Sequence, residues 1–354
     1  MATDKIRKYV LPNIPYLFIG WFCLKIGTAY RLAAGTGFGE KLLGLGQTIG
    51  AAFASFAPGL APLDWFVGIV GAAGFRLDVA DELPDAFIEK IRTAVKRVSP
   101  EKFLLGEVWE DATTKFGFDH RRTYLLGKGL DSVMNYPFKN AVLDFVKGKP
   151  AEQAANEILT ICEHYPAPAI DTALNFLSTH DTERALTVIA DEPANGRGRQ
   201  WQSGRCVTGD AYEEGLLRLR MAYAIIYTLP GVPCLYYGDE IAMQGYRDPF
   251  NRAFFRWDAH EQRLRPVLAQ LAQLRHTCEA VRTGKLWVLR AEGGILHYQR
   301  IGEVETAEII VNRTEHIIVE TLASGKSTEV NPMGFTIVVE EVGHNPNHSY
   351  YDYV

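Results

Sequence analysis

Hydrophobic and polar positions divide the chain into three parts with different periodicity. In residues 9–73, which are rich in Gly and Ala, the apolar positions follow neither a helical nor a strand period for long. From Gly74 to about residue 283, short apolar runs alternate with amphipathic stretches, which is typical of βα units around a parallel sheet. After Gly284 the pattern changes to short alternating strands. We therefore expect an α/β protein with three parts: a leader at 1–70, an α/β portion at 71–283 and a β domain at 284–354.

The middle part contains the elements that the pattern predicts most clearly. Apolar runs that predict strands or strand ends occupy 74–79, 103–109, 130–138, 172–181 and 231–240. Amphipathic helices are predicted over 84–98, 140–146, 154–162, 213–229 and 263–281. Strands and helices thus alternate along the chain, so that successive strands are expected to run parallel.

Composition places the chain among globular proteins. It has 354 residues, of which 47% are hydrophobic and 22% charged, and the formal net charge is −5. A negative net charge argues against a nucleic-acid partner. The five cysteines are scattered and odd in number, which favours free thiols over a disulfide framework or a zinc site. We therefore predict a cytoplasmic location.

The leader contains one segment that needs a separate interpretation. Residues 42–63 carry no charge and are long enough to cross a bilayer, but they include several glycines and two prolines. Two interpretations remain open: a membrane anchor, or a leader without regular structure. The modest hydrophobicity of the segment makes the membrane anchor the less favoured interpretation.

Three carboxylates follow apolar strands in the middle part. Asp78, Glu107 and Asp181 each stand at the end of a predicted strand. The carboxyl ends of parallel strands meet on one face of a barrel, so residues far apart in sequence would converge there. Taken singly, each acid could equally be a helix N-cap or an ion-pair partner.

The residues around two of these acids predict different protonation behaviour. Arg76 precedes Asp78 by two positions, so both side chains lie on the same side of a strand, and the guanidinium would keep Asp78 ionised by lowering its pKa. Glu107 has Trp109 two positions later, and apolar surroundings would raise its pKa. One ionised and one protonated carboxyl are what retaining glycoside cleavage requires, although an enolase-like or aldolase-like barrel fits the periodicity equally well.

Four motifs carry a family resemblance. "GFRLDVADE" (74–82), "GEVWED" (106–111) and "NFLSTHD" (175–181) resemble signature regions of the α-amylase superfamily, glycoside hydrolase family 13. "GVPCLYYGDEIAMQGYRDPFNRAFFRW" (231–257) is similar to the segment around the eighth strand in neopullulanases, cyclomaltodextrinases and related α-glucosidases. The resemblance implies a partial TIM (β/α)8 barrel, about strands 4–8, followed by a small C-terminal antiparallel β domain that caps it.

The resemblance also implies a role for each matching residue. Asp78 would be the nucleophile, Glu107 the general acid/base, and Asp181 the carboxylate that holds the distorted sugar. Arg76 would orient the nucleophile and His180 would bind ring hydroxyls. The remaining substrate-binding candidates, each with core packing or a loop ion pair as the alternative, are Trp109, Tyr136, Asp248 and Arg252.

One family signature, D-x-V-x-N-H at the end of the third strand, has no match in residues 1–73. We therefore expect strands one to three to be missing or replaced, and low or no activity for the isolated chain. The expected substrate is an α-glucan or maltooligosaccharide, cleaved with retention; a catalytically incomplete, sugar-binding fragment is the alternative. Calcium is a metal that the superfamily uses, but no metal site and no cofactor are assigned here. A homodimer stays open, as does the choice between hydrolysis and glycosyl transfer.

Overall fold

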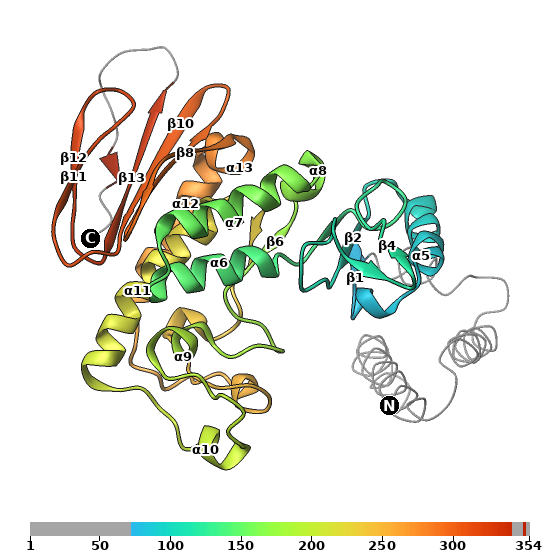
Figure 1. Cartoon of the computed structure of the whole chain (residues 1–354), viewed down its shortest axis with the longest axis horizontal. Coiled ribbons are helices and arrows are strands. Elements are labelled where there is room, and N and C mark those ends of the chain that lie inside the picture. Colours follow the sequence, from blue (N-terminus) through green and yellow to red (C-terminus); the bar gives the residue numbers. More distant parts are fainter. Residues whose placement is uncertain (1–71, 342–349, 352–354) are drawn as a thin grey trace, which may run out of the picture. The chain divides into compact units, whose positions relative to one another are not determined.

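The computed structural model describes residues 72–341 and 350–351 (Figure 1). The predicted leader, with its apolar segment 42–63, lies outside these residues. The described residues form two compact units, 72–75 with 86–104 and 76–85 with the rest. Within the described ranges, no helix combines the length and the apolar character that crossing a membrane requires.

Five short strands follow one another through the predicted α/β portion. They are β1 (Gly74–Leu77), β2 (Phe103–Gly106), β5 (Ser132–Val133), β6 (Leu174–Asn175) and β7 (Val232–Pro233). In parallel pairing, Leu105 lies opposite Ser132 and Leu174 opposite Val232, and a parallel bridge joins Met134 to Leu174. Strands β1, β2 and β5 form one sheet in that order, β6 and β7 form a second, and the Met134–Leu174 bridge joins the two. The predicted parallel arrangement is confirmed.

The strands are shorter than their apolar runs. The run 172–181 pairs only at β6, so Asp181 lies in a loop six residues beyond the strand and not at its end. The hydroxyl groups of Thr179 and Thr182 accept hydrogen bonds from main-chain N–H groups in this loop. These local bonds replace the hydrogen bonds of a longer ladder. The prediction that the strand delivers Asp181 directly is therefore wrong.

The long helices lie where the periodicity predicts them. They are α5 (Asp85–Val98), α6 (Tyr136–Lys147), α7 (Ala151–His164), α11 (Gly209–Thr228) and α12 (Leu264–Thr277). The predicted helix 263–281 is interrupted at Cys278, whose extended conformation separates α12 from α13 (Glu279–Thr283). Three short helices that no periodicity predicted are α8 (Ala167–Ile170), α9 (Ala185–Ala190) and α10 (Arg199–Ser203).

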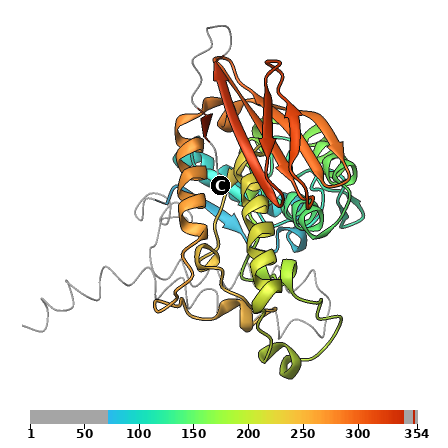
Figure 2. The same cartoon turned by 90° about the vertical axis from the view of Figure 1, so that its left-hand side faces the viewer.

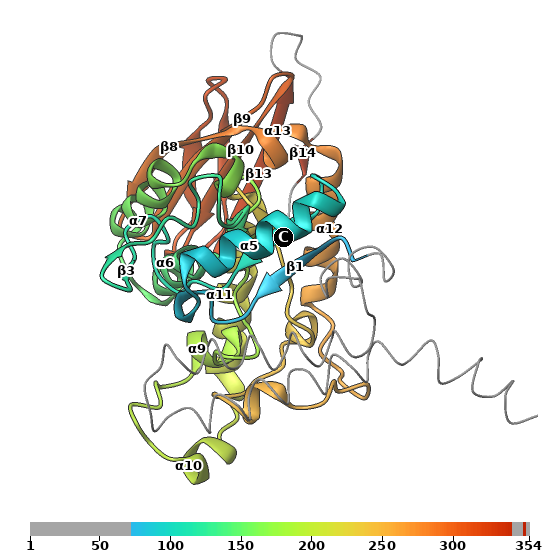
Figure 3. The ribbon, with the colours of Figure 1, turned by 90° about the vertical axis from the view of Figure 1, so that its right-hand side faces the viewer.

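Helix α6 begins inside the segment 130–138 that predicted a strand. Asn135 caps it by accepting a hydrogen bond from the N–H of Phe138, and Pro137 occupies its first turn. Gly148, at φ 144°, ends it. The cap and the proline override the β-favouring residues before them, so Tyr136 stands at the helix start, just beyond β5. Figure 3 shows α6 and α7 packed side by side.

Short elements complete the larger unit. The hairpin strands are β3 (Phe116–Gly117) and β4 (His120–Arg121), and the 3-10 helices are η3 (Ala80–Glu82), η4 (Asp239–Ile241) and η5 (Phe250–Arg252). These elements are too short for hydrophobic periodicity to predict.

The C-terminal part forms an antiparallel sheet, as predicted. Its strands are β8 (Lys285–Glu292), β9 (Ile295–Ile301), β10 (Glu305–Asn312), β13 (Gly334–Glu341) and β14 (Tyr350–Tyr351), in the spatial order β14, β13, β10, β9, β8. A separate hairpin pairs β11 (Ile318–Thr321), one of the short alternating strands predicted after Gly284, with β12 (Ser327–Val330), which was not predicted. Figure 2 shows the sheet (orange to red) beside the long helix α11 (yellow), with which β13 makes contact.

Strand β9 is buried on both faces, which explains its mixed composition. Tyr298 and Arg300 point one way: the Tyr298 hydroxyl lies 2.6 Å from the Thr228 hydroxyl, and Arg300 donates to the Thr228 carbonyl at 2.6 Å. Because Thr228 ends α11, these bonds fasten the sheet to the helix. His297 and Gln299 alternate with them and point to the opposite face.

That opposite face contains a buried polar cluster around Glu308. His297 Nε2 lies 2.6 Å from Glu308 Oε1, Gln299 donates to Oε2 at 2.9 Å, and the N–H of Ala323 donates to both oxygens. Burial acts to raise the pKa of Glu308, but the hydrogen bonds from His297, Gln299 and Ala323 outweigh it and lower the pKa. The cluster therefore stabilises the folded domain when Glu308 is ionised.

Replacing Glu308 by Ala should lower the free energy of unfolding by about 3 kcal/mol, because it leaves buried donors without an acceptor. Since the folded pKa lies below the unfolded one, the stabilisation is complete above pH ~4.5 and is lost as the pH falls through the folded pKa. Urea unfolding at pH 7 and at acid pH measures both effects. The matched control is Glu329→Ala, an exposed acid of β12; an equal loss in both variants would contradict the assignment.

Candidate active site

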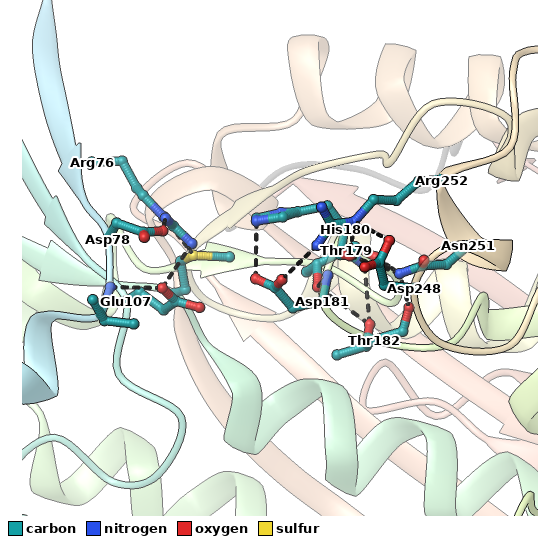
Figure 4. A network of polar contacts seen from close by, with 12 residues as sticks. Arg76, Asp78, Glu107, Thr179, His180, Asp181, Thr182, Asp248, Asn251 and Arg252 are labelled. Atoms are coloured by element: carbon teal, nitrogen blue, oxygen red, sulfur yellow. Dashed lines mark hydrogen bonds and ion pairs between the residues drawn. The ribbon is translucent and has the colours of Figure 1, made fainter. Parts of the chain in front are cut away.

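Arg76 joins two of the three predicted carboxylates. Arg76 is the last residue but one of β1. Its Nη1 forms an ion pair with Asp78, and its Nη2 lies 3.0 Å from Glu107 Oε2 (Figure 4). The i, i+2 spacing therefore places Arg76 beside Asp78, as predicted. The same guanidinium also contacts Glu107, which the sequence analysis did not foresee. One cation thus holds two carboxylates from neighbouring strands close together.

The two carboxylates differ in their exposure. The side chain of Asp78 is 72% exposed, whereas that of Glu107 is 4% exposed. Glu107 also accepts hydrogen bonds from the N–H of Val79 at 2.8 Å and from Trp109 Nε1 at 3.1 Å. The apolar setting predicted for Glu107 is therefore only part of its surroundings, because two hydrogen-bond donors and one cation converge on its buried carboxyl group.

Val79 adopts a conformation that is rare for its type. Its φ is 43° and its ψ is 50°, in the left-handed region that β-branched residues avoid. The carboxylate of Glu107 binds the N–H of this same residue. This hydrogen bond stabilises the sharp turn that directly follows Asp78, so Glu107 also fixes the backbone next to the exposed acid.

Asp181 belongs to a second polar group. His180 Nε2 lies 2.9 Å from its Oδ2, and Arg252 Nη2 donates to its Oδ1 at 3.1 Å. Arg252 also forms an ion pair with Asp248 at 3.3 Å. Four candidates that the sequence analysis singled out separately, Asp181, His180, Asp248 and Arg252, thus form one connected group, and the loop ion pair left open for Asp248 and Arg252 exists.

Tyr136 lies within the electrostatic range of both groups. Burial raises the pKa of its hydroxyl, and the negative charges of Glu107 and, more weakly, Asp181 raise it further. Its ring stacks on Trp109, with centroids 4.3 Å apart, and packs edge-on against Phe176 at 4.8 Å. Tyr136 is 1% exposed, so the core-packing alternative fits it better than sugar stacking. Trp109 is 41% exposed and has surface left for a ligand.

The sequence analysis missed a buried ion pair beneath the Asp181 loop. Arg184 Nη1 donates to Asp239 Oδ1 at 3.0 Å, and the Tyr223 hydroxyl donates to Asp239 Oδ2 at 2.8 Å. Burial raises the pKa of Asp239, and the charge of Arg184 opposes that shift. The guanidinium also lies over the ring of Tyr236, 4.2 Å from its centroid. A sequence signal existed: Arg184 follows the apolar run 172–181, and Asp239 stands at the end of the run 231–240.

A cavity of about 560 Å³ lies on the flank of the Asp181 group. Residues that line it include Glu183, Asp191, Arg197 and Arg247. The three predicted catalytic carboxylates are not among its lining residues, and Asp78 is open to solvent. We therefore place the candidate site at the carboxylates and not in this cavity.

The fold and these contacts agree with comparisons to known proteins. Residues 64–295 match the family described as "Alpha amylase, catalytic domain". This match covers more than half of the chain, so the protein belongs to the α-amylase family. The resemblance inferred from the four motifs is thereby confirmed.

Relatives with assigned names fall in the same family. The chain is 33% identical to a cyclomaltodextrinase of Geobacillus thermopakistaniensis over 247 residues, covering 68% of this chain and 37% of that protein. It is 29% identical to neopullulanase 2 of Thermoactinomyces vulgaris over 267 residues, covering 73% of this chain and 40% of that one. The chain thus spans about two fifths of these relatives.

Solved structures show the same partial coverage. A cyclic α-maltosyl-(1→6)-maltose hydrolase from Arthrobacter globiformis is similar with a TM-score of 0.66 and 26% identity, over 79% of this chain and 58% of that chain. The fold prediction is confirmed: the chain contains part of a TIM barrel of this family, followed by a C-terminal antiparallel sheet.

Replacing Arg184 by Met should lower the free energy of unfolding by about 3–5 kcal/mol, because Asp239 would remain buried without its cation. Adding Asp239→Asn should restore part of this loss, since no unpaired charge is then buried. Urea unfolding of the two single variants and the double variant measures the coupling between the residues. Strictly additive losses would show that the pair does not stabilise the fold as a unit.

Proposed function

We propose that this chain carries the catalytic carboxylates of a retaining α-glycosidase that acts on maltodextrins or related α-glucans. The observation that carries the proposal is the shared contact of Arg76 with Asp78 and Glu107. Retaining cleavage needs a nucleophile and a general acid/base close together on opposite sides of the glycosidic bond. Membership of the α-amylase family and the names of the relatives support the substrate class.

In the first step, a carboxylate oxygen of Asp78 attacks the anomeric carbon. The bond from that carbon to the glycosidic oxygen breaks, its electron pair stays on the leaving oxygen, and Glu107 gives that oxygen a proton. The exposure of Asp78 suits attack on a substrate, and Arg76 holds its carboxyl group in an ion pair. The product of this step is a glycosyl ester on Asp78 and a released sugar.

In the second step, Glu107, now a carboxylate, takes a proton from water. The resulting hydroxide adds to the anomeric carbon, the ester bond breaks, and Asp78 leaves as a carboxylate. Two inversions give net retention. If a sugar hydroxyl replaces water, the same intermediate gives glycosyl transfer, so both outcomes use the same residues.

Asp181 and His180 are proposed to hold the reacting sugar ring. Asp181 is 29% exposed and is paired with His180 and Arg252, so its oxygens have fixed directions. A fixed carboxylate can accept hydrogen bonds from ring hydroxyls that strengthen as the ring distorts. Trp109 is proposed to pack against an apolar sugar face, and Arg252 and Asp248 to border an outer subsite.

The second candidate function is a sugar-binding protein without turnover. The exposed ring of Trp109 and the paired carboxyl group of Asp181 would serve sugar binding without turnover as well. The sequence analysis expected low or no activity for the isolated chain because the signature of the third strand has no match in residues 1–73. Saturable maltodextrin binding without product would favour this alternative.

Further expectations about cofactors, partners and location complete the proposal. The reaction sequence above uses no cofactor, and we assign neither a cofactor nor a metal site. The substrate is the main partner, without nucleic acid, and a homodimer is allowed. Cys162, Cys206, Cys234 and Cys278 are free thiols, which supports a cytoplasmic location.

A 5-fluoro-α-glucosyl fluoride should label Asp78. The fluorine at C5 slows both steps, and the fluoride leaving group needs little acid assistance, so a covalent ester should accumulate even when turnover is slow. Intact-mass and peptide mass spectrometry would find the added sugar on the peptide with Asp78. The Asp78→Asn variant should stay unlabelled; a label on another residue would disprove the assignment of the nucleophile.

Glu107→Gln should affect two substrates unequally. Maltotetraose needs a proton on its leaving oxygen, so kcat/KM should fall by about 10³-fold or more. A p-nitrophenyl α-maltoside has a leaving group that departs as an anion, so its first step should be much less affected. Steady-state rates on both substrates measure this ratio, and equal losses would remove Glu107 from the acid role.

A further inference from the structure

One buried side chain, that of Asn251, donates hydrogen bonds to the loop that carries His180 and Asp181. Asn251 lies in η5 and is fully buried. Its Nδ2 donates to the carbonyl oxygen of His180 at 2.8 Å, of Thr182 at 2.8 Å and of Thr179 at 3.3 Å (Figure 4). Three of the four carbonyl groups between 179 and 182 therefore face one amide.

The orientation of this amide follows from its neighbours. Carbonyl oxygens accept hydrogen bonds and do not donate, so only the nitrogen of the Asn251 side chain can face three of them. Its Oδ1 is buried without a hydrogen-bond partner among the described residues. A buried acceptor without a partner costs free energy, and the three donated bonds offset that cost.

The loop also contains hydrogen bonds between its own residues. The N–H of Asp181 donates to the Thr179 hydroxyl at 3.1 Å, and the N–H of Thr179 donates to the Thr182 hydroxyl at 3.1 Å. Arg252, the neighbour of Asn251, adds a bond from its Nε to the His180 carbonyl at 2.8 Å. Main-chain donors and acceptors of the loop are thus largely satisfied, which leaves the loop few alternative conformations.

We propose that Asn251 is a positioning residue, which sets the directions of the His180 and Asp181 side chains by holding the backbone that carries them. This inference rests on the proposed function, because a fixed direction of Asp181 matters only if Asp181 holds the reacting sugar ring. Electrostatic stabilisation of a transition state depends on groups that are already in place, because they then need no reorganisation during the reaction. Asn251 touches no reacting atom in this assignment and acts through the loop.

The test compares two aspartates introduced at matched sites. Asn251→Asp keeps the shape of the side chain but replaces the donor with an oxygen that repels the loop carbonyls. Asn312 provides the control, because it is fully buried in the C-terminal sheet and its Nδ2 also donates to three carbonyl groups, those of His316, Val330 and Asn331. Asn312→Asp therefore removes the same set of bonds far along the chain from the loop.

The primary measurement is the imidazole spectrum of the full chain with ¹⁵N-labelled histidine, in which His180→Gln assigns the His180 signal. Asn251→Asp should shift or broaden that signal, because the loop backbone moves relative to Arg252 and Asp181. Asn312→Asp should leave it unchanged while lowering the unfolding midpoint. If both variants give the wild-type His180 signal, or both change it alike, the proposal is wrong.

A milder variant covers the case in which Asn251→Asp does not fold. Asn251→Ser keeps one neutral donor and adds no charge, so the His180 signal should shift in the same sense by a smaller amount; no shift in a folded Asn251→Ser would also overturn the proposal.

Where turnover is measurable, kcat should fall about 100-fold in Asn251→Asp with KM within about threefold. The spectrum needs no activity, so it separates failure of this proposal from failure of the proposed function.

Discussion

The candidate site depends on one electrostatic contact: two carboxyl groups that belong to neighbouring strands share a single cation. Whenever both are ionised, Asp78 and Glu107 would repel each other without that compensation. Arg76 supplies that cation from β1, two residues before Asp78, so the strand that positions Asp78 also positions its ion-pair partner. Glu107 in turn binds the N–H of Val79, which fixes the turn after Asp78. Charge compensation and backbone geometry are therefore joined in a few residues.

The rest of the larger unit positions a second group of charges in a similar way. Asp181 is held by His180 and Arg252, and the loop beneath it is supported by buried polar residues from the segment after β7. The buried pair Arg184 and Asp239 ties that same segment to the chain after the loop. Both groups thus consist of an acid at least partly open to solvent, with buried polar residues in contact with the segment that carries it. Buried contacts of this kind cost desolvation, and they are retained where direction matters more than stability.

The sequence singled out the residues of the candidate site, but it did not show where the elements that carry them end. Asp78, Glu107 and Asp181 could be found because each follows an apolar run within a motif, and the i, i+2 spacing placed Arg76 beside Asp78. The end of β6 could not be found in this way, because hydroxyl groups of Thr179 and Thr182 end the strand locally. The break at Cys278 and the helix start at Tyr136 escaped for a related reason. Caps and single extended residues override periodicity without changing it.

By itself, the sequence determined the order of the elements and the family, since these depend on local patterns and short motifs, and it singled out the three acids whose roles we propose. Only the tertiary structure decided which groups share a partner. Arg76 contacts both Asp78 and Glu107, Tyr136 is buried between Trp109 and Phe176, and Asn251 supports a loop some 70 residues earlier in the chain. Such contacts join residues with no fixed spacing in sequence. They arise when strands and loops fold together, and for that reason no periodicity could reveal them.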